Sequence, residues 1–296
     1  MISLDGLTKA YPGGRGVFDL TLDIAPGEVF GLLGPNGAGK STTIRHLMGF
    51  LRPDAGAARI RDLDCWADAP KVQAYVGYVP GEIGFPDEMT GAEFLDLMAG
   101  LRGSGSGVRR KDLCERFELD PLPPLRRMSK GTKQKVALVA GFMHEPAVLI
   151  LDEPTSGLDP LMQRRFLELV AEEQRRGATM LMSSHAFPEV ERVADRVGIL
   201  RAGRLVAVRD VASLRQMAKK VFTVTTASAS DHALIQAAGF TVVERRGLTL
   251  GVEVTGDYDA FIRALARCKV RALDIHPLDL EQIFMHFYSA EEAGLK

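Results

Sequence analysis

A glycine-rich stretch, GLLGPNGAGKSTT, has the residue types that hold phosphate groups. Gly34 and Gly39 frame four residues, and Lys40 and Ser41 follow at once. Glycines at these places let backbone N–H groups curl around phosphate oxygens, and the following helix presents the positive end of its dipole. Lys40 supplies a point charge at the β- and γ-phosphates, and Ser41 is positioned to ligate Mg²⁺. The stretch predicts a phosphate-binding loop; a glycine turn before an ordinary helix is the alternative.

Two adjacent carboxylates follow an apolar run in AVLILDEP. Asp152 ends the expected strand 112 positions after Lys40 (152 minus 40), where an enzyme with a phosphate loop needs a Mg²⁺ ligand. Glu153 comes next, within reach of the terminal phosphate, and could polarise the attacking water as a general base. Two acids at a strand end could instead cap the next helix.

A histidine follows another apolar run, TMLMSS. His185 could reach the γ-phosphate from the carboxyl edge of the sheet. A histidine taken alone is more often structural. The assignment therefore depends on the phosphate loop and the two acids nearby.

The segment MSKGTKQK, residues 128–135, sets a hydroxyl and a glycine before several cations. Ser129 and Gly131 would lie at the N-terminus of the helix KQKVALVAGFM, which suits an anion, and Lys130 adds positive charge. The alternative is a basic helix start that is exposed to solvent. The phosphate loop alone does not explain this segment.

Buried strands and amphipathic helices must position these groups. GEVFGLLG, PAVLILDE and ATMLMSS read as buried strands, and PLMQRRFLELVAEEQRRG as a helix that starts near Pro160 and stops at Gly177. This alternation predicts an α/β fold, a sheet with covering helices, over residues 1–215. The turn-rich GSGSG and DPLPP bracket a helical segment, which places an inserted helical subdomain near 84–145.

A second, smaller domain is expected over residues 216–296. KVFTVTT, DHALIQAAG, TVVERR, LTLGVEVT, YDAFIRALARC and VRALDI follow in the order β-α-β-β-α-β. That order predicts an α+β domain of ferredoxin-like type without catalytic residues of its own. The final DLEQIFMHFY reads as an amphipathic helix that packs through Phe284, Phe287 and Tyr288.

Composition limits the classes of function. With Lys+Arg 37 against Asp+Glu 38, the net charge of −1 predicts no general attraction to nucleic acid or anionic lipid. Cys65, Cys114 and Cys268 lack the spacing of a disulfide framework or zinc site, which favours a reducing cytoplasm. The start of the chain does not read as a signal peptide, and no apolar run is long enough to span a membrane. A membrane role therefore requires a partner.

Several motifs together resemble those of the ATP-binding subunits of ABC transporters, which are P-loop NTPases. Tyr11, GPNGAGKST, MSKGTKQK, LILDEPTSGLDP and SSH occur in that family's order over residues 1 to about 215. The resemblance implies that Tyr11 stacks on the adenine of ATP, Asp152 serves Mg²⁺ and Glu153 the water. It also implies that Asp159 makes a dimer contact and His185 meets the γ-phosphate. The implied phosphate-holding residues are Gly34, Pro35, Asn36, Gly37, Ala38, Gly39, Lys40, Ser41 and Thr42.

The same resemblance gives MSKGTKQK a role. Ser129, Lys130 and Gly131 align with the signature motif, which faces the ATP held by a second subunit, so that two chains would dimerise head to tail around two ATP molecules. The family usually has glycine where this chain has Lys130 and glutamine where it has Thr132.

A second departure from the family lies in YVPGE. The family normally has a glutamine after YVP that contacts the metal and the water, whereas this chain has Gly81 followed by Glu82. Either a water fills the coordination position, or Glu82 takes over with a negative charge. This loop and the helical subdomain after it are expected to meet the transmembrane permease.

The C-terminal pattern resembles that of ABC-2 exporters, including those that expel drugs, antibiotics or polysaccharides. The expectation is an ATP-hydrolysing exporter subunit, held at the inner face of the cell membrane by a separate permease and without a nucleic-acid partner. One alternative is a soluble ATPase of this type that acts on ribosomes or DNA; two cassettes or coiled-coil arms would favour it. A GTPase or kinase would leave the later motifs unexplained, and there is no N-K-x-D motif. The small domain could also sense a ligand.

Overall fold

The chain forms two units in the computed structural model, Met1–Val211 and Ala212–Lys296. The structure describes residues 1–86, 88–103, 107–217, 220–254 and 258–277. The division comes four positions before the expected boundary (215 minus 211), at the start of helix α8, Val211–Met217. Within the described residues, no helix is both long enough and apolar enough to cross a membrane.

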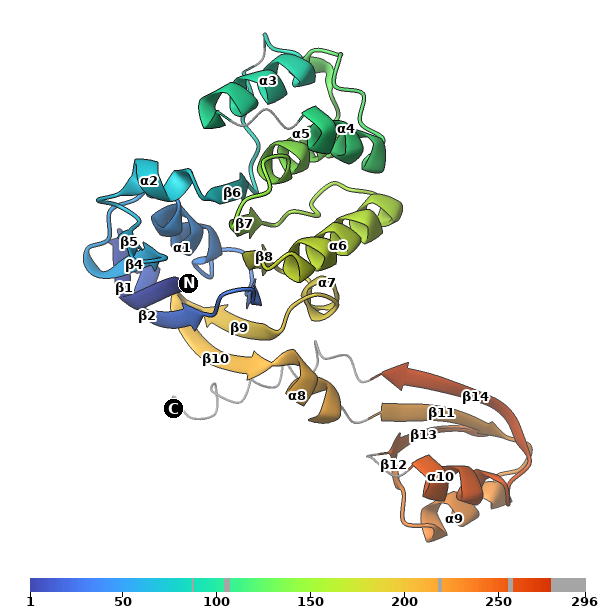
Figure 1. The fold of residues 1–296 in the computed structure, drawn as a ribbon. Helices are drawn as coiled ribbons and strands as arrows, with labels where there is room; N and C mark the ends of the chain where they lie inside the picture. The colour runs from blue at the N-terminus through green and yellow to red at the C-terminus, as the bar shows by residue number, and fades with distance from the viewer. Residues whose placement is uncertain (87, 104–106, 218–219, 255–257, 278–296) are drawn as a thin grey trace. The chain divides into compact units, whose positions relative to one another are not determined.

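A six-stranded sheet carries the chemistry-bearing loops of the first unit (Figure 1). Its strands are parallel except for the edge strand β10, which runs antiparallel to β9. The central strands are short runs in which every residue is buried, the pattern of a sheet covered on both faces. In spatial order they are β10 (Arg204–Asp210), β9 (Arg196–Arg201), β3 (Val29–Leu33), β8 (Thr179–Ser184), β7 (Val148–Asp152) and β6 (Val76–Val79).

A second, antiparallel sheet packs across helix α1, Lys40–Leu47. Apolar side chains of both sheets and of α1 form one core, which includes Leu7, Phe30, Ile44 and Leu47. The core fixes the helix directly after the phosphate loop. The second sheet consists of β2 (Arg15–Ile24), β1 (Ile2–Tyr11), β4 (Ala55–Ile60) and β5 (Leu63–Asp64).

Three further helices of the first unit flank these strands (Figure 1). Helix α6, Pro160–Arg175, buries one side through Phe166, Leu169 and Val170, and confirms the helix expected after LILDEPTSGLD. It starts with Asp159 as its N-cap and proline in its first turn, both of which favour a helix start. The two shorter helices are α2 (Ala69–Gln73) and α7 (Phe187–Glu191).

The segment expected to form the helical subdomain contains helices α3 (Gly91–Arg102), α4 (Gly107–Arg116) and α5 (Lys130–Phe142), with a 3₁₀ turn at Leu125–Arg127. Ion pairs tie α4 to α6. Arg116 donates two hydrogen bonds to Glu172, and Arg109 lies 2.5 Å from the almost fully buried Glu173. Helix α5 packs against β6. These contacts fix the helix that begins in MSKGTKQK.

The second unit has the β-α-β-β-α-β order predicted from the sequence. Its antiparallel sheet has the spatial order β12-β13-β11-β14, which is the ferredoxin-like arrangement. Phe222, Val224, Ile235 and Phe261 belong to its separate core. Its elements are β11 (Lys220–Thr226), α9 (Ser230–Ala237), β12 (Thr241–Arg246), β13 (Thr249–Val254), α10 (Tyr258–Leu265) and β14 (Val270–Pro277). The expected terminal helix lies outside the described residues.

Candidate nucleotide site

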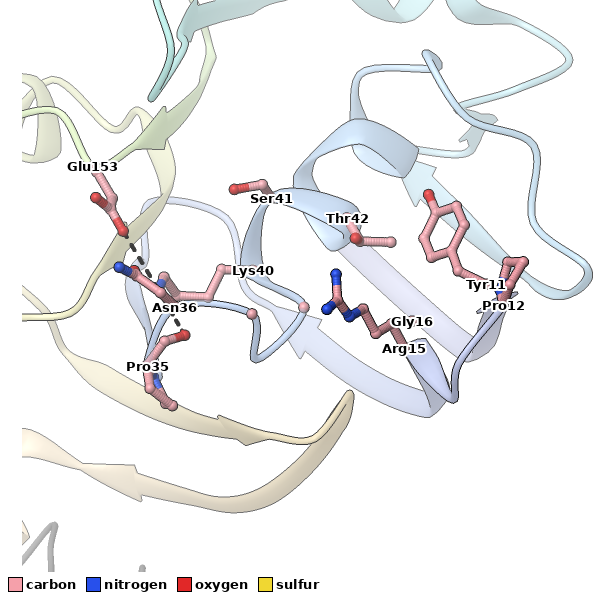
Figure 2. A pocket seen from close by; sticks show the side chains of 12 residues that line it. Tyr11, Pro12, Arg15, Gly16, Pro35, Asn36, Lys40, Ser41, Thr42 and Glu153 are labelled. Carbon is pink, nitrogen blue, oxygen red and sulfur yellow. Dashed lines mark hydrogen bonds and ion pairs between the residues drawn. The ribbon is translucent and has the colours of Figure 1, made fainter.

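A cavity of about 440 Å³ opens at the phosphate loop between β3 and α1 (Figure 2). It extends from the β1–β2 hairpin to the acid after β7. Gly39 precedes α1 with φ +110°, a conformation that glycine adopts without strain. The cavity brings together most of the predicted nucleotide-holding residues. Its lining residues are Tyr11, Pro12, Arg15, Gly16, Pro35, Asn36, Gly37, Gly39, Lys40, Ser41, Thr42 and Glu153.

Lys40 lies almost fully buried at the floor of this cavity. Its Nζ donates to the carbonyl oxygens of Gly34 at 2.7 Å and Pro35 at 3.3 Å. It also lies 3.4 Å from Glu153 Oε1 (Figure 2). Gly34 and Ala38, the two predicted loop residues that do not line the cavity, are buried beneath it. The ammonium group therefore has two carbonyl partners and one carboxylate partner, whose place an anionic phosphate would take.

Ser183 organises the two acids after β7. Its hydroxyl donates to Asp152 Oδ1 at 2.5 Å. The Glu153 N–H donates back to the Ser183 carbonyl and hydroxyl oxygens at 3.2 and 3.1 Å. Glu153 has φ +45°, a left-handed conformation that costs energy in a non-glycine residue and is frequent at functional sites. Ser183 is the first serine of SSH, and the sequence alone predicts no role for it.

His185 lies beside Glu153, as the predicted site requires. Its Nδ1 is 3.5 Å from Glu153 Oε2, and 63% of its side chain is exposed. Glu153 is thus held between Lys40 on one side and the histidine on the other. The exposed ring is free to meet a ligand that enters from solvent.

A second cavity, of about 650 Å³, meets the first at Asn36, Ser41 and Glu153. Asp152 and Ser41 both line it, so one carboxylate and one hydroxyl face the same space. Mg²⁺ is commonly bound by one or two such groups, with phosphate and water oxygens as the remaining ligands. The donor set therefore fits Mg²⁺. No group of three or more His, Cys, Asp or Glu side chains suited to a metal occurs in the described part of the chain.

The loop after β6 forms another wall of the second cavity. A Cβ on Gly81 would lie 3.2 Å from the Asp152 Cγ and Oδ2 atoms, so this loop passes very close to that carboxylate. Glu82 is exposed and lines the same cavity. Among the residues that the structure describes, Glu82 does not form a metal-binding group with Asp152 and Glu153.

Comparisons with known proteins agree with this geometry. Residues 17–156 match the family described as ABC transporter. The daunorubicin resistance ATP-binding protein DrrA3 of Streptomyces coeruleorubidus is 32% identical over 300 residues, which cover 96% of this chain and 95% of that protein. This chain belongs to the ABC transporter family. It is accordingly the ATP-binding subunit of a transporter of this family, with the ABC ATPase fold and with ATPase activity.

Other matches support the same assignment for the ABC ATPase. The bacitracin transport ATP-binding protein BcrA of Enterococcus faecalis is 33% identical, over 74% of this chain and 72% of that protein. A solved ATP-binding subunit of an ABC transporter is 33% identical, with a TM-score of 0.67, over 73% of this chain and 92% of that one. The P-loop fold predicted from the sequence is thereby confirmed.

The MSKGTKQK segment of the ABC ATPase begins helix α5. Ser129 is the N-cap, and its Oγ accepts from the Thr132 N–H at 3.1 Å. The Thr132 hydroxyl, where the family usually has glutamine, lies 2.9 Å from the same Oγ. Ser129 and Gly131 line neither cavity, whereas Lys130 lines the second. Within a single chain, the start of this helix therefore lies outside the first cavity.

Lys130 is bonded within its own chain. Its Nζ donates to Ser156 Oγ at 2.9 Å, and its stem packs over Gly157. The buried Gln134, one turn further along α5, donates to the carbonyl oxygen of Pro154 at 2.8 Å. These contacts fix the start of α5 against the loop that follows the two acids.

Asp159 ends that loop as the N-cap of α6. Its Oδ1 accepts from the Leu161 and Met162 N–H groups at 3.0 Å each. The hydrogen bond from Met162 is the main cause that lowers the pKa of this exposed carboxyl. Asp159 lines neither cavity and remains accessible for the predicted dimer contact.

An apolar groove of about 250 Å³ lies beside the second cavity of the ABC ATPase. It runs between the end of α1, the loop after β6, and helices α3 and α5. Phe50, 56% exposed, lines both the groove and the second cavity. The remaining groove residues are Met48, Gln73, Tyr78, Pro80, Ile83, Gly84, Phe85, Phe94, Met98, Arg102, Ala137 and Ala140.

Proposed function

We propose that this chain is the ATP-hydrolysing subunit of a membrane exporter for drug- or antibiotic-like compounds. The observation that carries the proposal is the meeting of two cavities at Ser41 and Glu153, which joins a phosphate loop to a carboxylate pair. Relatives named for daunorubicin resistance and bacitracin transport support the exporter class. Net charge near zero gives no support to a nucleic-acid partner.

ATP would lie along the first cavity. Tyr11 would stack on the adenine at one end, and the backbone of Gly34–Thr42 would hold the phosphates at the other. The distribution of these residues in Figure 2 supports this direction. Arrival of the γ-phosphate would replace the carbonyl contacts of Lys40 and its ion pair with Glu153.

Mg²⁺ would be held by Ser41 and Asp152, which share the second cavity. When bound, the ion would neutralise charge on the β- and γ-phosphates. The hydrogen bond from Ser183 would keep the Asp152 carboxylate oriented before any ligand arrives.

Glu153 would act as the general base. Once Lys40 turns to the phosphate, the Glu153 carboxylate is free to accept a proton from the attacking water. His185, 3.5 Å from the same carboxylate, would contact the γ-phosphate and so fix its position relative to that water.

A second copy of the chain would complete each ATP site. Ser129, Lys130 and Gly131 at the start of α5 would face the ATP of the partner, and Asp159 would contact the partner in a head-to-tail homodimer. The N-terminus of a 13-residue helix attracts a phosphate through its partial positive charge. Since Ser129 and Gly131 line neither cavity of their own chain, a role toward another chain accounts for the exposure of Ser129.

A permease would dock on the apolar groove, which would hold the subunit at the inner face of the cell membrane. The loop Pro80–Gly84 supports this proposal because it borders both the groove and the second cavity. A movement of the docked partner would therefore reach Gly81 and the neighbouring Asp152 directly. ATP binding would close the dimer, and hydrolysis would open it.

Two substitutions test the proposed ATP chemistry. Lys40→Ala should weaken ATP binding by about tenfold or more, because a charge-assisted contact to phosphate is lost. Glu153→Gln should keep ATP binding but lower turnover by about 100-fold, because the base is lost. The measurements are the ATP dissociation constant and the rate of phosphate release. Glu168→Gln, on the exposed side of α6, is the control.

Unchanged turnover of Glu153→Gln would refute its role as the base. If Lys40→Ala bound ATP as tightly as the wild type, the phosphate site would be wrongly assigned. The control should match the wild type in both measurements.

A further inference from the structure

One cationic side chain in the first cavity has no role in the site described above. Arg15 lines the cavity together with Tyr11 and Lys40. Lys40 has carbonyl partners and an ion pair. Among the described residues, none forms a hydrogen bond or an ion pair with the Arg15 guanidinium group. Arg15 is exposed, so water can solvate this guanidinium group, but its place in the lining of the cavity puts it within reach of an anionic ligand bound there.

The β1–β2 hairpin determines where this guanidinium lies. Tyr11 and Arg15 are opposite each other in the antiparallel register, on either side of a three-residue loop. Directly opposed residues in such a pair project to the same face. Gly13 and Gly14 have positive φ angles, as tight hairpin loops require. The hairpin therefore presents the tyrosine ring and the arginine side by side to the cavity.

Backbone contacts hold the arginine end of the hairpin against the phosphate loop. Gly203 donates its N–H to the Ala38 carbonyl at 2.9 Å, and its own carbonyl accepts from the Phe18 N–H at 2.8 Å. A Cβ on Gly203 would lie 2.4 Å from the Gly16 carbonyl oxygen, and one on Gly39 would lie 3.2 Å from the same atom. The hairpin is thus held at van der Waals distance from the loop.

We propose that Arg15 is a nucleotide-binding residue whose guanidinium pairs with the α-phosphate. Its side chain points upward between Tyr11 and Lys40, toward Thr42 (Figure 2). A nucleotide with its base on Tyr11 and its terminal phosphates at Lys40 must carry its α-phosphate past this position. The planar guanidinium group matches the geometry of phosphate oxygens. This inference rests on the ATP site proposed above and adds to it a contact with the phosphate nearest the nucleoside.

The test compares ligands that differ only in phosphate number. Dissociation constants of ADP, AMP and adenosine are measured for the full chain in EDTA by displacement of a fluorescent ADP analogue. Arg15→Ala should weaken ADP and AMP binding by about tenfold and leave adenosine nearly unchanged, because only the nucleotides have an α-phosphate. Arg15→Lys should recover part of the loss. Arg59→Ala, which removes an exposed charge from β4 of the same sheet, should change nothing.

Two other outcomes would overturn the role of Arg15, and a third would refute the proposed ATP site. Equal losses for adenosine and AMP would place the contact on the nucleoside and overturn the inference. Unchanged ADP binding by Arg15→Ala would overturn it as well. Failure of the wild-type chain to bind ADP would instead refute the proposed ATP site itself, so the two failures are distinguishable. Circular dichroism confirms that each variant is folded.

Discussion

The phosphate loop and the MSKGTKQK segment both lead into helix N-termini, but their surroundings differ. The phosphate loop and α1 enclose a cavity with Lys40 almost fully buried on its floor. Ser129 at the start of α5 is exposed and lines neither cavity. The first region is a preformed binding site, whereas the second has the right chemistry but no enclosing walls.

This difference indicates which functions one chain can perform alone. Nucleotide binding requires only groups that the phosphate cavity already brings together. Rapid hydrolysis, in the function proposed, also requires a partner's α5 over the γ-phosphate. Substitutions in the two regions should therefore change different measurements, and four predictions follow this division from the largest effect to the smallest.

The largest effect is expected at Asp152, the proposed Mg²⁺ ligand. Asp152→Asn should lower Mg²⁺-dependent ATP turnover by about 100-fold or more, because the carboxylate charge of the proposed metal site is lost. ATP binding measured in EDTA should change little. Asp62→Asn, in an exposed turn, is the matched control. Turnover close to that of the wild type would exclude Asp152 as the metal ligand.

A smaller effect is expected at Gly131, where the start of α5 packs against the loop after β7. A Cβ on Gly131 would lie 2.5 Å from the Gly157 carbonyl oxygen. Gly131→Ala should therefore lower the free energy of unfolding by about 1–2 kcal/mol, because backbone atoms must shift. Urea unfolding measures it. Gly100→Ala, in helix α3 with open space around it, should be neutral or slightly stabilising. Equal results for the two variants would contradict the close packing at Gly131.

The bond between Lys130 and Ser156 should contribute less. Lys130→Met keeps the apolar stem but loses the 2.9 Å hydrogen bond, and turnover should fall severalfold while ADP affinity stays unchanged. A double-mutant cycle with Ser156→Ala should give a coupling of about 0.5–1 kcal/mol in unfolding free energy. Purely additive effects would show that the bond does not join α5 to the following loop.

A pH-dependent effect of similar size is expected at His144, just after α5. Burial, with a further contribution from Arg102, lowers its pKa to about 4. The unfolded chain then binds the proton more tightly, so stability is complete above about pH 6.5 and is lost as pH falls toward 4. Between pH 7.5 and 5.0, the wild type should lose about 1 kcal/mol more than His144→Gln, with allowance for partial solvent exposure. Parallel losses would contradict the lowered pKa.

Much of this architecture follows from local sequence. The strands that end at Leu33 and Asp152 are continuous apolar runs, and their buried, parallel arrangement follows from that pattern. Strand ends of one sheet share an edge, so Lys40 and Glu153 could be expected to meet although they are 113 positions apart (153 minus 40).

Other features depend on packing that no local pattern specifies. Arg15 faces the nucleotide cavity because hairpin register pairs it with Tyr11. Ser183 reads as a polar strand end, but parallel pairing with Asp152 makes it the partner of both acids. The hydrogen bond between Lys130 and Ser156 joins the first residue of α5 to the loop after β7, 26 positions further along the chain. These residues are identified only when the strands and loops are in place.

The most direct test of the account is the mass in solution of Glu153→Gln, with and without MgATP. The same measurement is made on that protein also carrying Ser129→Arg. We expect the mass of a single chain without nucleotide, twice that mass with MgATP, and the mass of a single chain again when the arginine is present. A dimer that persists with Ser129→Arg, or that forms equally well without ATP, would contradict the proposal that the start of α5 binds the partner's phosphate.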